Sequence, residues 1–342
     1  MLAAEYVIGA GIEVSTGKAP APGPGEVQIA VAFTGICGTD LHIAHGAMDE
    51  RTGPRRVIGH EMAGTVAALG DGVGEFAVGD AVTVMPLLWC GTCPTCLAGN
   101  SHICENLTFV GIDSPGALQE RWNVPAHIVV PLPAGMSLRD AALVEPVAVA
   151  HHDVTRGRLA AGEQVAVVGG GPVGLLIAAV AAERGADVVV IEPDSYRRGV
   201  IGDLGFATLD PANDDVAARI AERSGGAGID VAFEVSGSQP GLTTALAVLR
   251  PRGRLVAVGI HTALREVDLK RIFWRELEVL GARVYDRNDY DAAIALIANG
   301  HIPVEAIISE VVPLAQAPQA FEALSRGGSV MKVLVDCREA NA

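Results

Sequence analysis

The distribution of apolar and polar positions changes along the chain and divides it into two kinds of structure. Up to about residue 135, short β-branched runs such as 26–33 and 81–85 are separated by clusters of glycine and proline, a pattern that predicts antiparallel β-structure. From about residue 163, short apolar runs alternate with longer helical patterns. This second pattern predicts repeated β-α units in a parallel sheet.

The second part contains six candidate strands. They lie at 164–168, 187–192, 207–210, 230–235, 254–260 and 277–284. Six is the number of strands in a doubly wound dinucleotide-binding fold. A helical stretch over 289–299 and a strand-like run over 331–335 follow. The apolar run 172–182 is shorter than the roughly 18 residues needed to span a bilayer, so it predicts a buried helix.

A glycine-rich turn at 169–174, Gly-Gly-Gly-Pro-Val-Gly, follows the first candidate strand and opens the buried helix. Missing side chains at Gly169 and Gly171 let the backbone turn tightly and approach a pyrophosphate, while Gly174 allows close packing of helix and strand. The strand–turn–helix order predicts a dinucleotide site. A purely structural glycine turn is the alternative.

An acidic residue ends the next candidate strand. Glu192 lies eighteen residues after Gly174, where a carboxylate can accept hydrogen bonds from an adenosine ribose. Since this carboxylate repels a 2′-phosphate, we expect NAD rather than NADP. Arg197 and Arg198 are close enough in sequence to weaken that preference.

Four of the six cysteines fall within fifteen residues: Cys90, Cys93, Cys96 and Cys104. This spacing predicts a four-thiolate tetrahedral zinc site. Four thiolates leave no position for a substrate, so the site is structural and helps to order its loop. Disulfides or an iron–sulfur cluster are the alternatives.

A second set of candidate metal ligands is spread along the chain: Cys37, His60, Glu61 and Glu145. Mixed thiolate, imidazole and carboxylate donors suit a catalytic zinc that keeps a coordination position open. Taken singly, each residue also fits a structural role as a buried thiol, a core histidine or a solvated carboxylate. Spacing alone does not bring the four together.

Composition and charge narrow the possible classes of protein. The 342 residues suggest about two domains, and 50% hydrophobic residues with a mean hydropathy of +0.35 exclude a globally disordered chain. A net charge of −15 disfavours nucleic acid and anionic lipid as partners. The N-terminal residues lack the cationic stretch of a secretory signal, so we expect a cytoplasmic protein.

Four motifs together resemble those of zinc-dependent medium-chain alcohol dehydrogenases, over nearly the full length. They are Cys-Gly-Thr-Asp-x-His at 37–42, Gly-His-Glu at 59–61, the cysteine quartet and the turn at 169–174. Within that family, the Gly-His-Glu motif followed by the segment 142–150 resembles the polyol branch, which includes sorbitol, 2,3-butanediol and threonine dehydrogenases.

The resemblance implies roles for the matched residues. Cys37 and His60 are implied to bind the catalytic zinc, with Glu61 and Glu145 binding it directly or holding its water. Thr39 and His42 are implied as a proton relay.

On the cofactor side, the resemblance implies contacts from Val173, Glu192 and Arg197. The other candidate cofactor-binding residues are those of the glycine-rich turn: Gly169, Gly171, Pro172 and Gly174. Tyr285 lies in a stretch that lines the substrate cleft in this family, but its role stays open.

The fold implied is α/β, with a doubly wound six-stranded parallel nucleotide-binding domain and a β-rich GroES-like catalytic domain. We expect residues 1–145 and 286–342 to form the catalytic domain, residues 146–285 to form the NAD-binding Rossmann domain, and the active site to lie in the cleft between them. The family further implies two zinc ions per chain and a homo-oligomer, a dimer or tetramer.

The implied reaction is reversible oxidation of a secondary alcohol in a vicinal diol or polyol, with hydride transfer to NAD. A threonine 3-dehydrogenase or another sugar-alcohol dehydrogenase is the alternative within the family. A non-enzymatic zinc and nucleotide-binding module is the alternative from another class.

Overall fold

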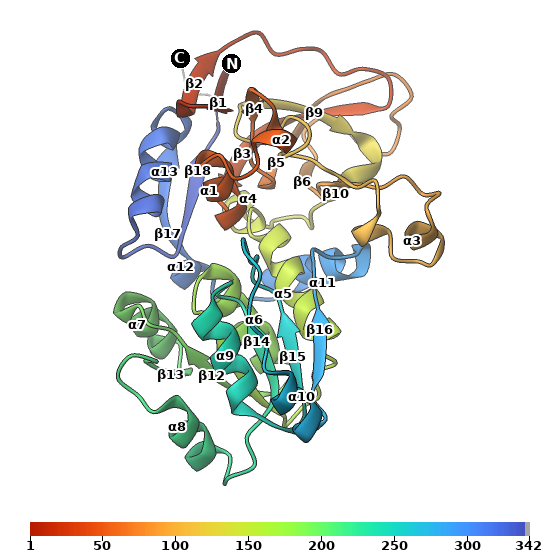
Figure 1. Ribbon diagram of the computed structural model, residues 1–342. Helices are drawn as coiled ribbons and strands as arrows, with labels where there is room; N and C mark the ends of the chain where they lie inside the picture. Colours follow the sequence, from red (N-terminus) through yellow and green to blue (C-terminus); the bar gives the residue numbers. More distant parts are fainter. Residues whose placement is uncertain (339–342) are drawn as a thin grey trace. The chain divides into compact units, whose positions relative to one another are not determined.

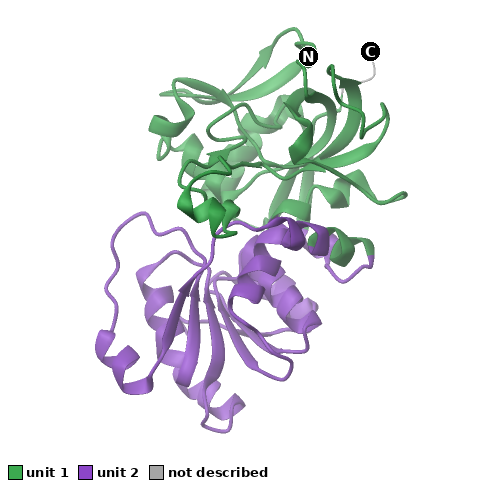
Figure 2. Ribbon diagram, turned by 90° about the vertical axis from the view of Figure 1, so that its right-hand side faces the viewer, with its two compact units in different colours: residues 1–145, 293–298, 308–342 green, residues 146–292, 299–307 purple. Residues whose placement is uncertain are grey.

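The computed structural model describes residues 1–338, and the chain divides into two compact units (Figures 1 and 2). Unit 1 consists of residues 1–145, 293–298 and 308–342, and unit 2 of residues 146–292 and 299–307. One boundary falls inside a helix, directly after Glu145. No helix in the described part of the chain is long and apolar enough to cross a membrane.

Unit 1 is built around a seven-stranded sheet with the order β10-β6-β5-β3-β18-β17, in which β9 also pairs with β3. Its strands come from both ends of the chain, because the late strand β18 pairs antiparallel with the early strand β3. The strands of unit 1 are β1 (Leu2–Val7), β2 (Gly11–Thr16), β3 (Glu26–Gly35), β4 (Arg55–Val57), β5 (Glu61–Leu69), β6 (Ala81–Val84), β7 (Leu87–Leu88), β8 (Thr108–Phe109), β9 (Arg121–Pro125), β10 (Val129–Pro131), β17 (Ile308–Pro313) and β18 (Lys332–Asp336).

Short helices connect these strands, and the smaller sheets β2-β1-β4 and β7-β8 complete the unit. The α-helices are α1 (Gly38–Ala44), α2 (Asp49–Thr52), α3 (Pro94–Leu97), α4 (Leu138–Ala141) and α13 (Ala317–Arg326), and the 3-10 helices are η1 (Ser101–Ile103), η2 (Ala126–Ile128) and η3 (Leu314–Gln316). The mostly antiparallel β-structure predicted for the first part of the chain is confirmed.

Unit 2 has a six-stranded parallel sheet with the order β13-β12-β11-β14-β15-β16, which confirms the doubly wound fold (Figure 2). The order reverses between β11 and β14, so the carboxyl ends of these two strands form the crevice where such sheets bind ligands. The strands are β11 (Gln164–Val168), β12 (Asp187–Ile191), β13 (Ala207–Leu209), β14 (Ile229–Glu234), β15 (Leu249–Ala257) and β16 (Glu278–Gly281).

Apolar β-branched residues form these strands because both faces of the sheet are buried, and a core that includes Ala166, Ile191 and Leu255 packs against the helices. The helices are α6 (Pro172–Glu183), α7 (Ser195–Asp203), α8 (Val216–Arg223), α9 (Gln239–Val248), α10 (Leu269–Arg275) and α12 (Val304–Ile307). The helices α5 (Val144–Arg156) and α11 (Arg287–Ala298) each contribute residues to both units.

The element boundaries that differ most instructively from the sequence prediction are those of β15, β16 and α11. Strand β15 begins at Leu249 instead of residue 254, because a bulge lets Leu249 pair with Ile229. Strand β16 ends at Gly281 instead of residue 284, and Val284 has a φ of +50°, which is incompatible with a strand. Helix α11 begins two residues early because the Asp286 side chain accepts hydrogen bonds from the first backbone N–H groups.

Candidate functional site

The first candidate ligand lies at the start of α1, directly after the central strand β3. The Cys37 sulfur accepts a hydrogen bond from the backbone N–H of Thr39, and the Asp40 carboxylate accepts one from the backbone N–H of Cys37. This capping box fixes the orientation of the Cys37 thiol. Thr39 and His42 are three residues apart on the same helix, so they share one face of α1.

The structure brings Cys37, His60 and Glu61 together. Their ligand atoms lie within 4.8 Å of one another, and the histidine and glutamate are buried. His60 Nδ1 faces the buried Asp40 Oδ1 at 3.6 Å, and neither atom has a hydrogen-bond partner among residues 1–338. A histidine whose second nitrogen faces a carboxylate is the arrangement typical of a metal ligand, so the three donors fit a zinc ion.

A buried ion pair holds Glu61. Lys332 Nζ lies 2.7 Å from Glu61 Oε1, 2.5 Å from Oε2 and 3.2 Å from the carbonyl oxygen of Ile36. The two side chains extend from the first residues of β5 and β18, the strands that flank β3. A Cβ at Gly35 on β3 would lie 2.2 Å from Glu61 Oε2, so a side chain there would have to displace this carboxylate.

The charges of the site shift the pKa values of its buried groups. Burial alone lowers the pKa of His60, but the charges of Asp40, Cys37 and Glu145 raise it well above its usual value. Burial likewise opposes the charged form of Lys332, and Glu61 reverses that effect and raises its pKa. The acidic groups around His60 and Lys332 therefore favour their cationic forms, and a zinc cation would meet the same negative field.

Glu145 does not lie within the three-donor group. It is buried in the first turn of α5, and its charge contributes to raising the pKa values of His60 and Lys332. The structure therefore places the two predicted carboxylates differently: Glu61 belongs to the three-donor group and contacts a lysine, and Glu145 lies outside that group.

The four clustered cysteines form the second metal-ligand group. Cys104 Sγ lies 3.5 Å from Cys90 Sγ and 3.8 Å from Cys93 Sγ. These separations exceed the roughly 2.0 Å of a disulfide bond. They match the roughly 3.8 Å expected between sulfurs bound tetrahedrally to one zinc at about 2.3 Å.

Backbone N–H groups point at the sulfurs of the quartet. Those of Cys93 and Cys96 lie 3.4 Å from the sulfurs of Cys90 and Cys93, respectively. Hydrogen bonds from the Thr92 and Cys93 backbone lower the pKa of the Cys90 thiol to about 5. The thiolate is the metal-binding form, so the loop fits a zinc ion.

The glycine-rich turn joins β11 to α6 in unit 2. Gly169 has a φ of +107°, and a Cβ there would lie 2.9 Å from the backbone nitrogen of Ser236. A Cβ at Gly174 would lie 1.9 Å from the carbonyl oxygen of Gly169. Gly171 precedes the helix and provides no side-chain cap, so the first N–H groups of α6 remain available to an anion, as a dinucleotide requires.

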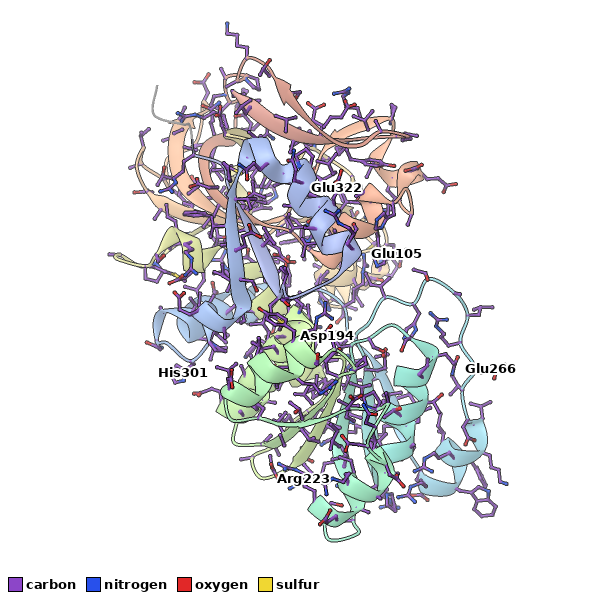
Figure 3. All side chains as sticks on the ribbon, turned by 90° about the vertical axis from the view of Figure 1, so that its left-hand side faces the viewer. Glu105, Asp194, Arg223, Glu266, His301 and Glu322 are labelled. Atoms are coloured by element: carbon purple, nitrogen blue, oxygen red, sulfur yellow. The ribbon has the colours of Figure 1, made fainter. Side chains whose placement is uncertain are left out.

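Glu192 follows β12 and lies beside this turn. Its Oε2 accepts a hydrogen bond from the backbone N–H of Gly170 at 2.5 Å, and its Oε1 accepts one from Asp194 at 2.8 Å. Asp194, labelled in Figure 3, caps the helix α7 that carries Arg197. Arg197 Nη1 comes within 3.7 Å of the position of a Cβ at Gly171, and its buried Nε has no partner in the described part of the chain.

The two histidines after Glu145 are members of neither candidate metal group. His151 and His152 each contact one oxygen of Asp289 through Nδ1, at 2.7 Å. Arg184 contacts the other ring nitrogen of His151 at 2.9 Å. Asp289 therefore holds both rings within unit 2.

Two polar residues of these sites were missed from the sequence. Lys332 is 271 positions from Glu61, and only the pairing of β18 with β3 brings them close. Glu234, the last residue of β14, is fully buried at the crevice of unit 2. An acidic residue that ends an otherwise apolar strand is a signal that could have identified it.

Comparisons with known proteins agree with this geometry. Residues 23–134 match the alcohol dehydrogenase GroES-like domain, and residues 172–299 match the zinc-binding dehydrogenase domain. A 2-dehydro-3-deoxy-L-galactonate 5-dehydrogenase of Pseudoalteromonas atlantica is 49% identical over 98% of this chain and 99% of its own. The chain belongs to the zinc-binding alcohol dehydrogenase family.

Solved structures of this dehydrogenase family have the same fold. A putative zinc-binding dehydrogenase of Sinorhizobium meliloti bound to NADP has a TM-score of 0.92 at 32% identity, covering 98% of both chains. The 2R,3R-butanediol dehydrogenase of Bacillus subtilis has a TM-score of 0.90 at 32% identity, covering 98% of this chain and 99% of its own. This dehydrogenase is therefore a zinc-dependent oxidoreductase that acts on alcohol CH–OH groups with a nicotinamide cofactor.

Proposed function

We propose that this dehydrogenase oxidises a secondary alcohol in a polyol or sugar acid, and that Cys37, His60 and Glu61 would hold the catalytic zinc. The observation that carries the proposal is the buried grouping of a thiol, an imidazole and a carboxylate within 4.8 Å. Three protein ligands leave a fourth coordination position open, which distinguishes this group from the four-cysteine site. When bound, zinc supplies Lewis-acid stabilisation of an alkoxide.

The surrounding residues provide the orientation and the proton path. Asp40 faces His60 Nδ1, which leaves the other ring nitrogen for the metal. Thr39 accepts the alcohol proton through its hydroxyl, and His42 on the same face of α1 passes it to solvent. Glu145, which lies outside the three-donor group, is assigned to hold a water molecule at the zinc site. His42→Ala is expected to lower turnover without changing zinc content.

The four-cysteine loop is proposed to hold a second, structural zinc, giving two per chain. The sulfur separations and the backbone N–H groups directed at the sulfurs support this assignment. Unit 1 is accordingly proposed as the catalytic domain and unit 2 as the NAD-binding domain.

NAD is proposed as the cofactor. Val173 and Pro172 open α6 beside the turn, where the pyrophosphate is expected. The support for NAD is Glu192, whose carboxylate lies beside the turn and repels a 2′-phosphate. Arg197 is assigned to the phosphates, because its guanidinium lies near Gly171.

The substrate class is tested by initial rates of NADH formation. The panel consists of 2,3-butanediol isomers, sorbitol, xylitol, a simple secondary alcohol, threonine and a sugar acid of the galactonate type. The sugar acid is included because the relative from Pseudoalteromonas atlantica is named for such a substrate. A preference for a diol, polyol or sugar acid supports the proposal, and a preference for threonine contradicts it.

Matched variants test the ligand assignment. Cys37→Ala and His60→Ala are expected to abolish turnover while the quartet zinc remains bound. Turnover retained by either variant would show that the three-donor group is not the reaction centre. Loss of both zinc ions in either variant would show that the two sites are not independent.

A homo-oligomer, a dimer or tetramer, is also proposed. The support comes from an apolar surface on unit 2, formed by α10 and the edge strand β16. Phe273 and Trp274 are 74% and 71% exposed and contact each other, and Leu269 lies one turn earlier on the same helix. Exposed apolar clusters of this kind mark protein interfaces.

A further inference from the structure

The loop 258–268 joins β15 to α10 and carries the labelled residue Glu266 in Figure 3. It borders a mainly apolar hollow of about 760 Å³ whose lining includes Leu242, Leu255 and Val279. Leu264 at its middle is fully exposed, so packing does not fix the loop there. Its conformation therefore depends on a few polar contacts.

Glu234 provides the main anchor for this loop. The carboxylate is fully buried at the end of β14, and its Oε1 accepts hydrogen bonds from the backbone N–H of Ser236 at 3.0 Å and of Gly237 at 3.1 Å. Its Oε2 lies 3.0 Å from Nε2 of His261. One carboxylate thus connects the turn after β14 to the loop after β15.

The contacts of His261 determine its tautomer. Arg265 donates from Nε to His261 Nδ1 at 3.1 Å, so Nδ1 is the acceptor. The ring proton is then on Nε2, which donates to Glu234. Arg265 also donates from Nη2 to the carbonyl oxygen of Gly237 at 3.0 Å, which closes the connection between loop and turn.

These residues lie at the cofactor crevice. The turn after β14 touches the glycine-rich turn, because a Cβ at Gly169 would lie 2.9 Å from the nitrogen of Ser236. It also touches the loop, because a Cβ at Gly259 would lie 2.4 Å from the nitrogen of Gly237. The turn after β14 therefore packs against both neighbours, and the hydrogen bonds of Glu234, His261 and Arg265 join it to the loop after β15.

Each half of a doubly wound sheet holds one half of a dinucleotide. Glu192 follows β12, so the half formed by β11, β12 and β13 holds the adenosine, and the half formed by β14, β15 and β16 faces the nicotinamide ribose. Glu234 and His261 belong to the second half. Their hydrogen bonds hold the turn after β14 and the loop after β15, and both segments belong to the nicotinamide half.

We propose that His261, held between Glu234 and Arg265, is a positioning residue for the nicotinamide half of the cofactor. It acts through the backbone of the turn after β14 and the loop after β15, and it has no part in binding the adenosine half. The inference rests on the proposed nicotinamide cofactor and adds a residue whose effect is confined to one half of it.

The test compares NADH with AMP, a probe of the adenosine half, in binding titrations of the full-length zinc-loaded enzyme. His261→Ala is expected to weaken NADH binding by about tenfold, the effect of one hydrogen bond to a charged group, and to leave AMP binding unchanged. His261→Gln retains an amide donor and acceptor and is expected to recover most of the NADH affinity. Leu264→Ser, on the same loop but fully exposed, is the matched control.

Two outcomes overturn the inference. Unchanged NADH binding in His261→Ala would remove the positioning role, and an equal loss of NADH and AMP binding would show a general structural role. Arg265→Met breaks the contact to Nδ1 while it keeps the apolar stem, and it provides the same comparison if His261→Ala does not fold. Failure of the unmodified enzyme to bind NADH would instead contradict the proposed function.

Discussion

Lys332 and Glu61 form a fully buried ion pair next to two candidate zinc ligands. The pair keeps the Glu61 carboxylate beside the thiolate of Cys37, although carboxylates repel thiolates. A lysine at this position therefore sets how much negative charge the zinc ligands present to the metal.

Replacing Lys332 with methionine is expected to leave Glu61 buried and unpaired, and to destabilise unit 1 by about 3–5 kcal/mol. The double variant Lys332→Met, Glu61→Gln removes both charges and is expected to regain most of that stability without regaining activity. Thermal unfolding and zinc content measure the two effects. Equal stability of the single and double variants would contradict the role assigned to the pair.

Asp153 on α5 is a second buried charged residue, and its effect on the stability of the protein can be measured. It is fully buried, and neither carboxylate oxygen has a hydrogen-bond partner among the described residues. Burial, together with the charge of Asp289, raises the pKa of Asp153 well above its usual value. The unfolded chain releases this proton at a lower pH than the native state, so native stability falls as pH rises between the two pKa values.

Asp153→Asn removes that dependence and is expected to stabilise the protein by about 1–3 kcal/mol at neutral pH. Little gain is expected at about pH 3, below the unfolded-state pKa of about 3.9, where the carboxyl group is mostly protonated in both states. Denaturant unfolding at the two pH values measures the difference. An equal gain in stability at both pH values would mean that ionisation of Asp153 does not cause the gain.

At the scale of elements, local patterns predicted most of what the structure contains. The alternation of strands and helices in unit 2 and the cysteine quartet depend on neighbouring residues, so both could be predicted. The three-donor group and Lys332 depend on pairing between β3, β5 and β18, which no local pattern specifies. A resemblance to known motifs identified Cys37 and His60, but it did not identify Lys332, and hydrophobic periodicity cannot predict which buried position carries a charge.

The loop that carries the cysteine quartet has few ways to keep its shape without a metal. Its buried apolar cluster consists of three of the cysteines, with Leu107 packed against them. Its secondary structure is limited to the short helices α3 and η1. The zinc ion proposed for this loop would supply the order that a larger core otherwise provides.

Cys93→Ser is expected to lower the zinc content from two to one per chain and to expose residues 90–104 to protease, while NADH binding by unit 2 remains. Limited proteolysis with mass spectrometry measures the exposure, and Thr92→Ser, which removes no sulfur, serves as the control. A loop that resists protease after losing its zinc would show that the metal does not order it.

At the scale of the whole molecule, the apolar surface of α10 and β16 predicts self-association. Leu269, Phe273 and Trp274 are each more than two-thirds exposed. Full burial of two aromatic rings removes about 300–500 Å² from water, a substantial part of the roughly 800 Å² per partner in a standard interface.

The double variant Phe273→Ser, Trp274→Ser is expected to shift the enzyme toward monomer in light-scattering measurements. Leu97→Ser, which changes an equally exposed apolar residue in unit 1, is the matched control. An unchanged mass for the double variant would place the interface elsewhere.

The separation of Lys332 from Glu61 along the chain also has a consequence for biosynthesis. Lys332 is added by the ribosome 271 residues after Glu61. Until then β3 lacks its neighbour β18, and the carboxylate that follows His60 lacks the counter-charge of Lys332. The strands of the parallel sheet, which end with β16, are all synthesised earlier. The order of translation therefore delays assembly of the three-donor group with its lysine until β18 has been made.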